Sequence, residues 1–150
     1  MGIQDELQKV DVFRGLSSSQ LEKIENISEM REYHDGELVH QESEKAEHLF
    51  ILVNGEIELR VQLTTHNQRI TVGVINRSNQ CFGWSGVISP NYFTAAAVCC
   101  QNSTVIAIDG KKLIEILEDE PAAGFKVMKG IAEIISSRLR NCRSALLKTL

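Results

Sequence analysis

The stretch YHDGELVHQESEKAEHLFILVNGEIEL, residues 33–59, decides the fold class of this chain. Residues 48–54 form a dense apolar run, which is typical of a buried strand. The run ends at Asn54-Gly55, a pair that favours a tight hairpin turn. Residues 56–63 then alternate polar and apolar side chains without a break. This alternation predicts a strand with one face in water and one face in the core.

Further short strands are expected on both sides of this stretch. Turn residues bound them, as at Asp35-Gly36 and in the segment Thr64-Thr65-His66-Asn67. The additional strands are expected at residues 37–41, 70–75, 92–99 and 103–108. Short strands at regular intervals predict a sandwich or a barrel.

Helical periodicity flanks the strands at both ends of the chain. Residues 1–30 predict a helical lead-in, in which the serines at 17–19 offer a helix cap. Residues 110–150 predict two helices, a short one that ends near Pro121 and a long one after it. The expected fold is therefore mainly β with flanking helices: a double-stranded β-helix (jelly-roll) barrel at 31–109, within a single domain of residues 1–150.

The last helix carries an apolar seam at the spacing of a coiled coil. Its residues step by four and three alternately over about three heptads. They are Met128, Ala132, Ile135, Leu139, Cys142 and Leu146. The pattern predicts a homodimer through residues 125–148, and the alternative is a helix that packs only on its own barrel.

Composition excludes several classes of protein. The net charge of −4 argues against non-specific attraction to DNA, and the basic side chains of residues 125–150 are interpreted as a solvated helix face. We therefore expect no nucleic-acid contact by this chain. No apolar run is long enough to span a bilayer, and the first residues do not resemble a signal peptide. We expect no membrane association and a cytoplasmic location.

Cysteines and histidines do not predict a metal site or a catalytic site. The four cysteines (81, 99, 100 and 142) form no CxxC pair and are expected to be free thiols. The four histidines (34, 40, 48 and 66) form no HxH pair, and each is interpreted as a surface or turn residue. A cupin-type metalloenzyme, which needs several histidines and an acid at one point, is accordingly less favoured. We expect no catalytic residues, no metal and no cofactor.

Three segments together resemble the cyclic-nucleotide-binding domain family. They are VFRGLSSSQLEKI (12–24), the stretch 33–59, and QCFGWSGVISPNYFTAAAVCCQNSTVIAID (80–109). The resemblance covers roughly residues 10–145 and implies the sensor fold of regulators of the catabolite-activator and FNR type. Gly36, Gly55 and Gly83 fall where the family turns its chain tightly.

The resemblance implies a phosphate-binding cassette at residues 82–95. In the family, this cassette contains a Phe-Gly-Glu turn, a short helix, and an arginine that pairs with the cyclic phosphate. Here Phe82 and Gly83 match, but Trp84 occupies the position of the acid, and Phe93 (or Tyr92) that of the arginine. The resemblance assigns a pocket to Phe82, Gly83, Trp84, Ser85, Gly86, Tyr92, Phe93, Thr94 and Ala95.

The altered cassette predicts that cyclic AMP and cyclic GMP are not bound in the usual way. Three interpretations remain open: aromatic side chains fill the pocket, the pocket takes an apolar or aromatic ligand, or the backbone amides still hold a nucleotide. The family resemblance implies a non-enzymatic sensor or regulatory module that signals through its last helix. Alternatives are a haem sensor, or the sensor fragment of a transcription regulator, because the chain stops at Leu150 before any DNA-binding helix.

Overall fold

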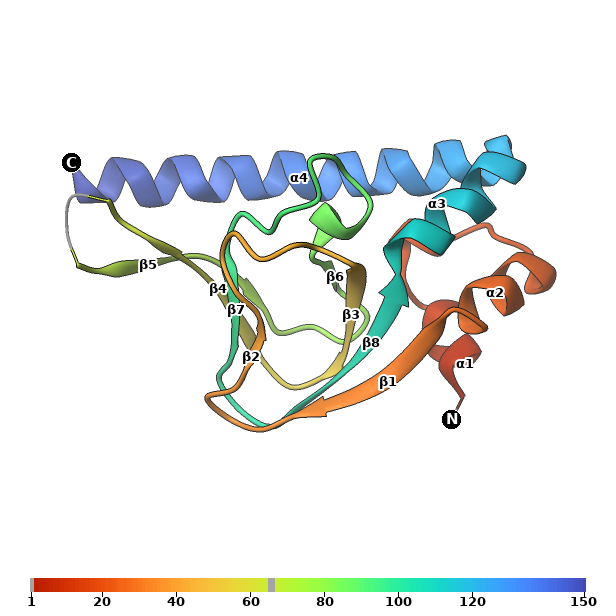
Figure 1. Ribbon diagram of the computed structural model, residues 1–150, viewed down its shortest axis with the longest axis horizontal. Helices are drawn as coiled ribbons and strands as arrows, with labels where there is room; N and C mark the ends of the chain where they lie inside the picture. The colour runs from red at the N-terminus through yellow and green to blue at the C-terminus, as the bar shows by residue number, and fades with distance from the viewer. Residues whose placement is uncertain (1, 65–66) are drawn as a thin grey trace.

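The computed structural model describes residues 2–64 and 67–150 (Figure 1). Within these residues the strands are β1 (Ser28–Tyr33), β2 (Leu38–His40), β3 (His48–Asn54), β4 (Ile57–Gln62), β5 (Arg69–Ile75), β6 (Cys81–Phe82), β7 (Ala96–Cys99) and β8 (Ser103–Asp109). The helices are α1 (Ile3–Leu7), α2 (Ser18–Glu25), α3 (Gly110–Asp119) and α4 (Pro121–Thr149), with the 3₁₀ turns η1 (Asp11–Phe13) and η2 (Trp84–Gly86).

Two four-stranded antiparallel sheets face each other. One has the strand order β1-β8-β3-β6 and the other β2-β7-β4-β5. The N-terminal helices and α3 lie at one end of the barrel, and α4 runs along one side of it (Figure 1). This arrangement confirms the predicted jelly-roll barrel with N-terminal helices and a long C-terminal helix.

The expected strands at 48–54, 56–63 and 103–108 correspond to β3, β4 and β8 within one or two residues at each end. The two-residue strand β6 was not anticipated, because so short a segment has no periodicity. Of the turn expected at 64–67, residues 65 and 66 lie outside the described part of the chain.

The expectation of a helical lead-in over residues 1–30 is wrong at its end. The helix α2 stops at Glu25, and β1 begins at Ser28. β1 is an edge strand that pairs only with β8, and Met30 on it is 41% exposed. Because β1 has few buried side chains, the alternation that marks a strand is missing from its sequence.

The strand expected at 92–99 is also shorter than predicted. Regular pairing is confined to β7, and Tyr92 makes only an isolated bridge to Lys45. The backbone of Phe93 still donates to the Glu44 carbonyl (2.9 Å) and accepts from the Ser43 amide (2.8 Å). The segment before β7 is thus a loop held firmly in place.

The helix boundaries follow from local chemistry. Ser17 caps α2 by accepting from the Gln20 amide at 3.1 Å, as the serine cluster predicts. Asp109 caps α3 by accepting from the Lys112 amide at 3.0 Å. Pro121 separates the two last helices as expected and is the first residue of α4, where a missing N–H costs nothing.

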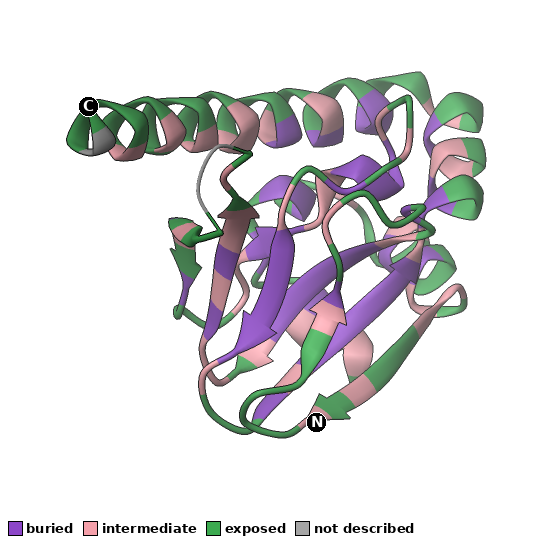
Figure 2. Ribbon diagram, turned by 60° about the vertical axis from the view of Figure 1, so that its left-hand side comes forward, coloured by how far each residue is buried: buried purple, intermediate pink, exposed green. Residues whose placement is uncertain are grey.

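The apolar side chains form two clusters, one on each face of the sheet that contains β3. One cluster joins this sheet to the helices, and the other fills the inside of the barrel. Residues 49–52 of β3 are all buried, because one face lies under the helices and the other inside the barrel (Figure 2). This double burial explains why the run at 48–54 does not alternate.

The helix α4 is buried unevenly along its length. Ala123, Gly124, Val127 and Ile131 are buried, and the described residues beyond Ile131 are half-buried or exposed (Figure 2). Among the described helices, none combines the length and hydropathy needed to cross a bilayer.

Gly36, Gly55 and Gly83 all have positive φ, as the turn pattern predicts. We expect Gly55→Ala to destabilise the fold by about 3 kcal/mol or more, because a Cβ there is strained at φ +115° and would overlap Ser103. Gly36→Ala, at φ +90° with open space around it, should cost only about 1–2 kcal/mol. Urea midpoints of the two variants measure the difference, and equal midpoints would contradict it.

Candidate ligand pocket

The cassette turn has the shape expected from the resemblance. After β6, Gly83 adopts a left-handed conformation (φ 75°) and leads into η2. A Cβ at Gly83 would lie 2.8 Å from the Phe50 ring, so a side chain has no room there. The turn leads directly to Trp84 and Ser85, and Trp84 also packs against the cluster between the sheet and the helices.

A small cavity lies at this turn. Its lining residues are His40, Leu59, Gly83, Trp84, Ser85, Phe93, Thr94 and Ala95, and its volume is about 20 Å³. A cavity of this size has room for about one water molecule. A nucleotide has no space here while the surrounding side chains keep these positions.

The structure brings together six of the nine residues assigned to the pocket, from Gly83 through Ser85 and from Phe93 through Ala95. The other three do not line the cavity. Phe82 is buried in the barrel cluster, Gly86 lies against the backbone of His48, and Tyr92 is 54% exposed.

His40 is the pocket residue that the sequence did not reveal. It was interpreted as a surface or turn residue, but it is only 4% exposed, so that interpretation is wrong. Its ring lies 3.6 Å from that of Phe93, centroid to centroid, with 9° between the planes. The pairing of β2 with β7 shifts register between Leu38 and His40, and such an irregularity changes which face a side chain occupies.

Phe50 and Phe82 extend this stack. Their rings are 5.4 Å apart, and the Phe50 ring is 5.9 Å from that of His40. The four rings come from β2, β3, β6 and the loop before β7. They fill the space at the centre of the cassette with apolar surface.

Burial also determines the charge of His40. It lowers the pKa of the imidazole to about 4, and the backbone groups of Ala95 and Gln41 act in the opposite direction without outweighing burial. Neither ring nitrogen has a partner in hydrogen-bond geometry among the described residues. His40 is therefore neutral at pH 7, and the residues that line the cavity carry no positive charge.

Elsewhere, one group of described residues has metal-ligand chemistry: Glu56, Glu58 and Cys100. The hydroxyl of Thr71 and the guanidinium of Arg60, at 3.0 Å, lower the pKa of Glu58. Arg60 forms an ion pair with Glu58 and neutralises its charge. These three residues are therefore better explained by that ion pair than by a metal site. All four cysteines are free, as predicted, and burial raises the pKa of Cys81 to about 12.

The seam predicted on α4 is only partly open. Ala132, Leu139 and Leu146 are exposed, with Leu139 at 69%. Met128, Ile135 and Cys142 are half-buried and pack against the two apolar clusters of the same chain, beside the fully buried Val127 and Ile131. Phe125, 70% exposed and seven residues before Ala132, extends the seam by one turn and was missed.

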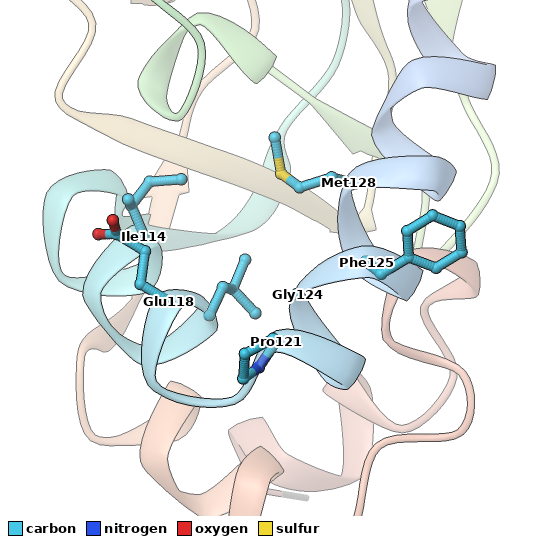
Figure 3. Close-up of a pocket in the computed structure, with 7 residues that line it drawn as sticks. Ile114, Glu118, Pro121, Gly124, Phe125 and Met128 are labelled. Atoms are coloured by element: carbon cyan, nitrogen blue, oxygen red, sulfur yellow. The ribbon is translucent and has the colours of Figure 1, made fainter.

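An apolar groove of about 290 Å³ lies between α3 and the start of α4. Ile114, Leu117 and Glu118 of α3 form one wall, and Pro121, Gly124, Phe125 and Met128 of α4 form the other (Figure 3). Phe125 and Met128 belong to the seam as well, so the open apolar surface continues from the seam into this groove.

The described residues form a jelly-roll barrel with a short cassette turn and a long C-terminal helix. The model of the cyclic nucleotide-binding domain matches residues 30–120, and the chain belongs to this family. A search of the curated proteins finds no match.

Solved structures agree with this assignment. A protein of Geobacter metallireducens GS-15, described as a cyclic nucleotide-binding protein, is 29% identical with a TM-score of 0.80, covering 93% of this chain and 99% of that one. The sensor domain of the transcriptional regulator DNR from Pseudomonas aeruginosa is 19% identical with a TM-score of 0.77, covering 91% of each chain. A cyclic nucleotide-binding domain from Methylobacillus flagellatus KT is 17% identical with a TM-score of 0.79, covering 99% and 83%.

We expect acid to destabilise the barrel through His40. In the unfolded chain this histidine has a pKa near 6.5, whereas in the folded chain the pKa of His40 is about 4. As the pH falls, the unfolded chain therefore takes up a proton before the folded chain does. Stability is therefore lost as pH falls through this window, by an amount on the order of 3 kcal/mol.

His40→Phe should remove that part of the pH dependence, measured by urea unfolding at pH 7, 5.5 and 4. His34→Phe, at an exposed histidine, is the matched control and should keep the wild-type slope. An unchanged slope in His40→Phe would show that His40 is not the group responsible.

Proposed function

We propose that this chain is a non-enzymatic regulatory module that does not bind cyclic AMP or cyclic GMP in the usual manner of its family. The observation that carries the proposal is the Phe93–His40 stack at the cassette, which leaves a cavity of only about 20 Å³. The module acts as a homodimer through α4, and the free cysteines are consistent with work in the cytoplasm.

Charge supports the same conclusion. A cyclic phosphate brings a negative charge that must lose its water on entering the pocket, and this is costly without a cation or a set of donors. Phe93 occupies the arginine position and is 5% exposed, and His40 behind it is neutral. The residues of the cassette turn and of the His40–Phe93 stack thus supply neither the space nor a cation for a cyclic phosphate.

Dimerisation is supported by the apolar seam of α4. Seven apolar or small side chains, from Phe125 to Leu146, follow one heptad seam; three of them, Met128, Ile135 and Cys142, also pack against the clusters of their own chain, and the others are exposed. Burying the exposed part of the seam against its copy is favourable at roughly 25 cal/mol per Å² of apolar surface. The helix packs on η1 and α3 near its start and on β5 farther along, so a change in the barrel can alter how the two seams meet.

Calorimetric titration tests the pocket. We expect no heat of binding at micromolar concentrations of cyclic AMP or cyclic GMP, with circular dichroism of the same sample to show that the protein is folded. Micromolar binding of either nucleotide would overturn this part of the proposal.

Light scattering tests the dimer. The wild-type chain should have twice the mass of one chain, and Leu139→Glu should give single chains, because it places a charge in the centre of the seam. Leu147→Glu is the matched control, since Leu147 is 58% exposed on the same helix but lies outside the seam. If the wild-type chain is monomeric, or if both variants remain dimeric, the seam is not the interface.

A further inference from the structure

Arg138 on α4 differs from the other basic residues of that helix. Its side chain is half-buried, and its Nη1 donates only one long hydrogen bond, 3.4 Å, to the Val72 carbonyl. Its Nε is buried and has no partner among the described residues. Burial also lowers the pKa of its guanidinium, which still remains charged at pH 7.

The position of this guanidinium follows from Gly73 on β5. A Cβ built at Gly73 would overlap Nη1 and Cζ of Arg138, so the guanidinium occupies the place of the missing side chain. Gly73 pairs with Leu59 of β4, and paired residues project to the same face, about 5 Å apart. Leu59 lines the cassette cavity, so the guanidinium over Gly73 lies on the same face of the sheet as a wall of that cavity, although Arg138 is not itself one of the lining residues.

No carboxylate of the described residues lies within ion-pair distance of this guanidinium. The described ion pairs involve Lys9, Arg14, Lys23, Arg31 and Arg60, and none includes Arg138. Nor is the missing partner among residues 1, 65 and 66, which are Met, Thr and His. A partly buried cation without an anion is costly, so the site is incomplete within one chain.

A second copy of the chain does not complete the site. Glu133 is the only acid between residues 125 and 150. In the heptad of the seam, Arg138 precedes the core position Leu139, and a parallel partner would bring Arg143 of the second copy toward it. Dimerisation would therefore add positive charge at this point and would not neutralise it.

We propose that Arg138 is the cation of this pocket and that its ligand is a small organic anion with a flat apolar body. The anionic group, a carboxylate or a phosphate, pairs with the guanidinium from the α4 side. The apolar body lies along Leu59 toward Trp84 and Phe93, where the ring of Phe93 has to move aside. This proposal rests on the proposed function, because it places the ligand in the same cavity.

Such a ligand would act directly on the dimer helix. Arg138 precedes Leu139, the more exposed of the two seam leucines. An anion that draws the guanidinium toward the cavity would rotate or shift this turn of α4. The ligand would thereby favour one arrangement of the seam over another.

Nuclear magnetic resonance titration of the full chain tests the proposal, with benzoate, phenyl phosphate and inorganic phosphate as probes and benzyl alcohol as the uncharged analogue. Fragments of this size bind at best near the millimolar range, so titration to about 10 mM is appropriate. We expect shifts of the Leu59 methyl and Trp84 indole signals with benzoate or phenyl phosphate, and at least tenfold weaker binding of benzyl alcohol. The two aromatic anions distinguish a carboxylate ligand from a phosphate ligand.

Arg138→Gln should weaken the binding of both anions at least tenfold, whereas Arg140→Gln, at an exposed arginine of the same helix, should leave it unchanged. Equal binding by wild type and Arg138→Gln, or no shift at Leu59 and Trp84 with any anion, would overturn the proposal. Thermal unfolding of Arg138→Met adds an independent measurement. We expect an unchanged or higher Tm, and a clear fall would show that the guanidinium only fastens α4 to β5.

The two proposals can fail separately. Micromolar binding of cyclic AMP that survives Arg138→Gln would overturn the proposed function and would also assign the anion to another group. Cyclic AMP binding that Arg138→Gln abolishes would overturn the proposed function alone.

Discussion

The stack of His40 on Phe93 is the contact on which the pocket depends. His40 belongs to one sheet, Phe50 and Phe82 belong to the other, and Phe93 reaches the stack from the loop before β7. Each aromatic pair contributes about 0.5–1.5 kcal/mol beyond the burial of its surface. Against this stands the cost of burying the imidazole, whose nitrogens have no partner in good hydrogen-bond geometry among the described residues; an unsatisfied buried polar group costs about 1–3 kcal/mol. The contact that closes the barrel therefore gains free energy from the packing of the rings and loses free energy by burying a polar imidazole.

The buried imidazole of His40 is a feature that stability alone does not explain. A core built only for stability would place a leucine or a phenylalanine where His40 stands, since neither leaves a polar atom unsatisfied. Arg138 presents the same imbalance against β5, with a charge instead of a neutral ring. Two uncompensated polar side chains are the kind of exception that marks a functional site.

The sequence predicted the barrel because its central strands carry strong local patterns: the apolar run of β3, the alternation of β4 and the glycine at the turn between them. It failed at β1, an edge strand without an apolar face, and at residues 92–95, where the chain bridges without regular pairing. His40 and Arg138 were missed for a different reason. Their burial arises from a register shift and from a glycine on a distant strand, and neither relation is local in the sequence.

The uneven burial of α4 has a mechanical consequence. The helix has 29 residues and a length of about 44 Å, yet its fully buried contacts end at Ile131. The roughly 27 Å beyond that residue meet β5 and the barrel cluster only through half-buried side chains such as Arg138, Cys142 and Ala145. A tilt of about 5° at Ile131 displaces the far end of the helix by roughly 2 Å, which is comparable to the helix shifts seen in switching proteins. Such a tilt would rearrange these half-buried contacts and leave the fully buried core in place.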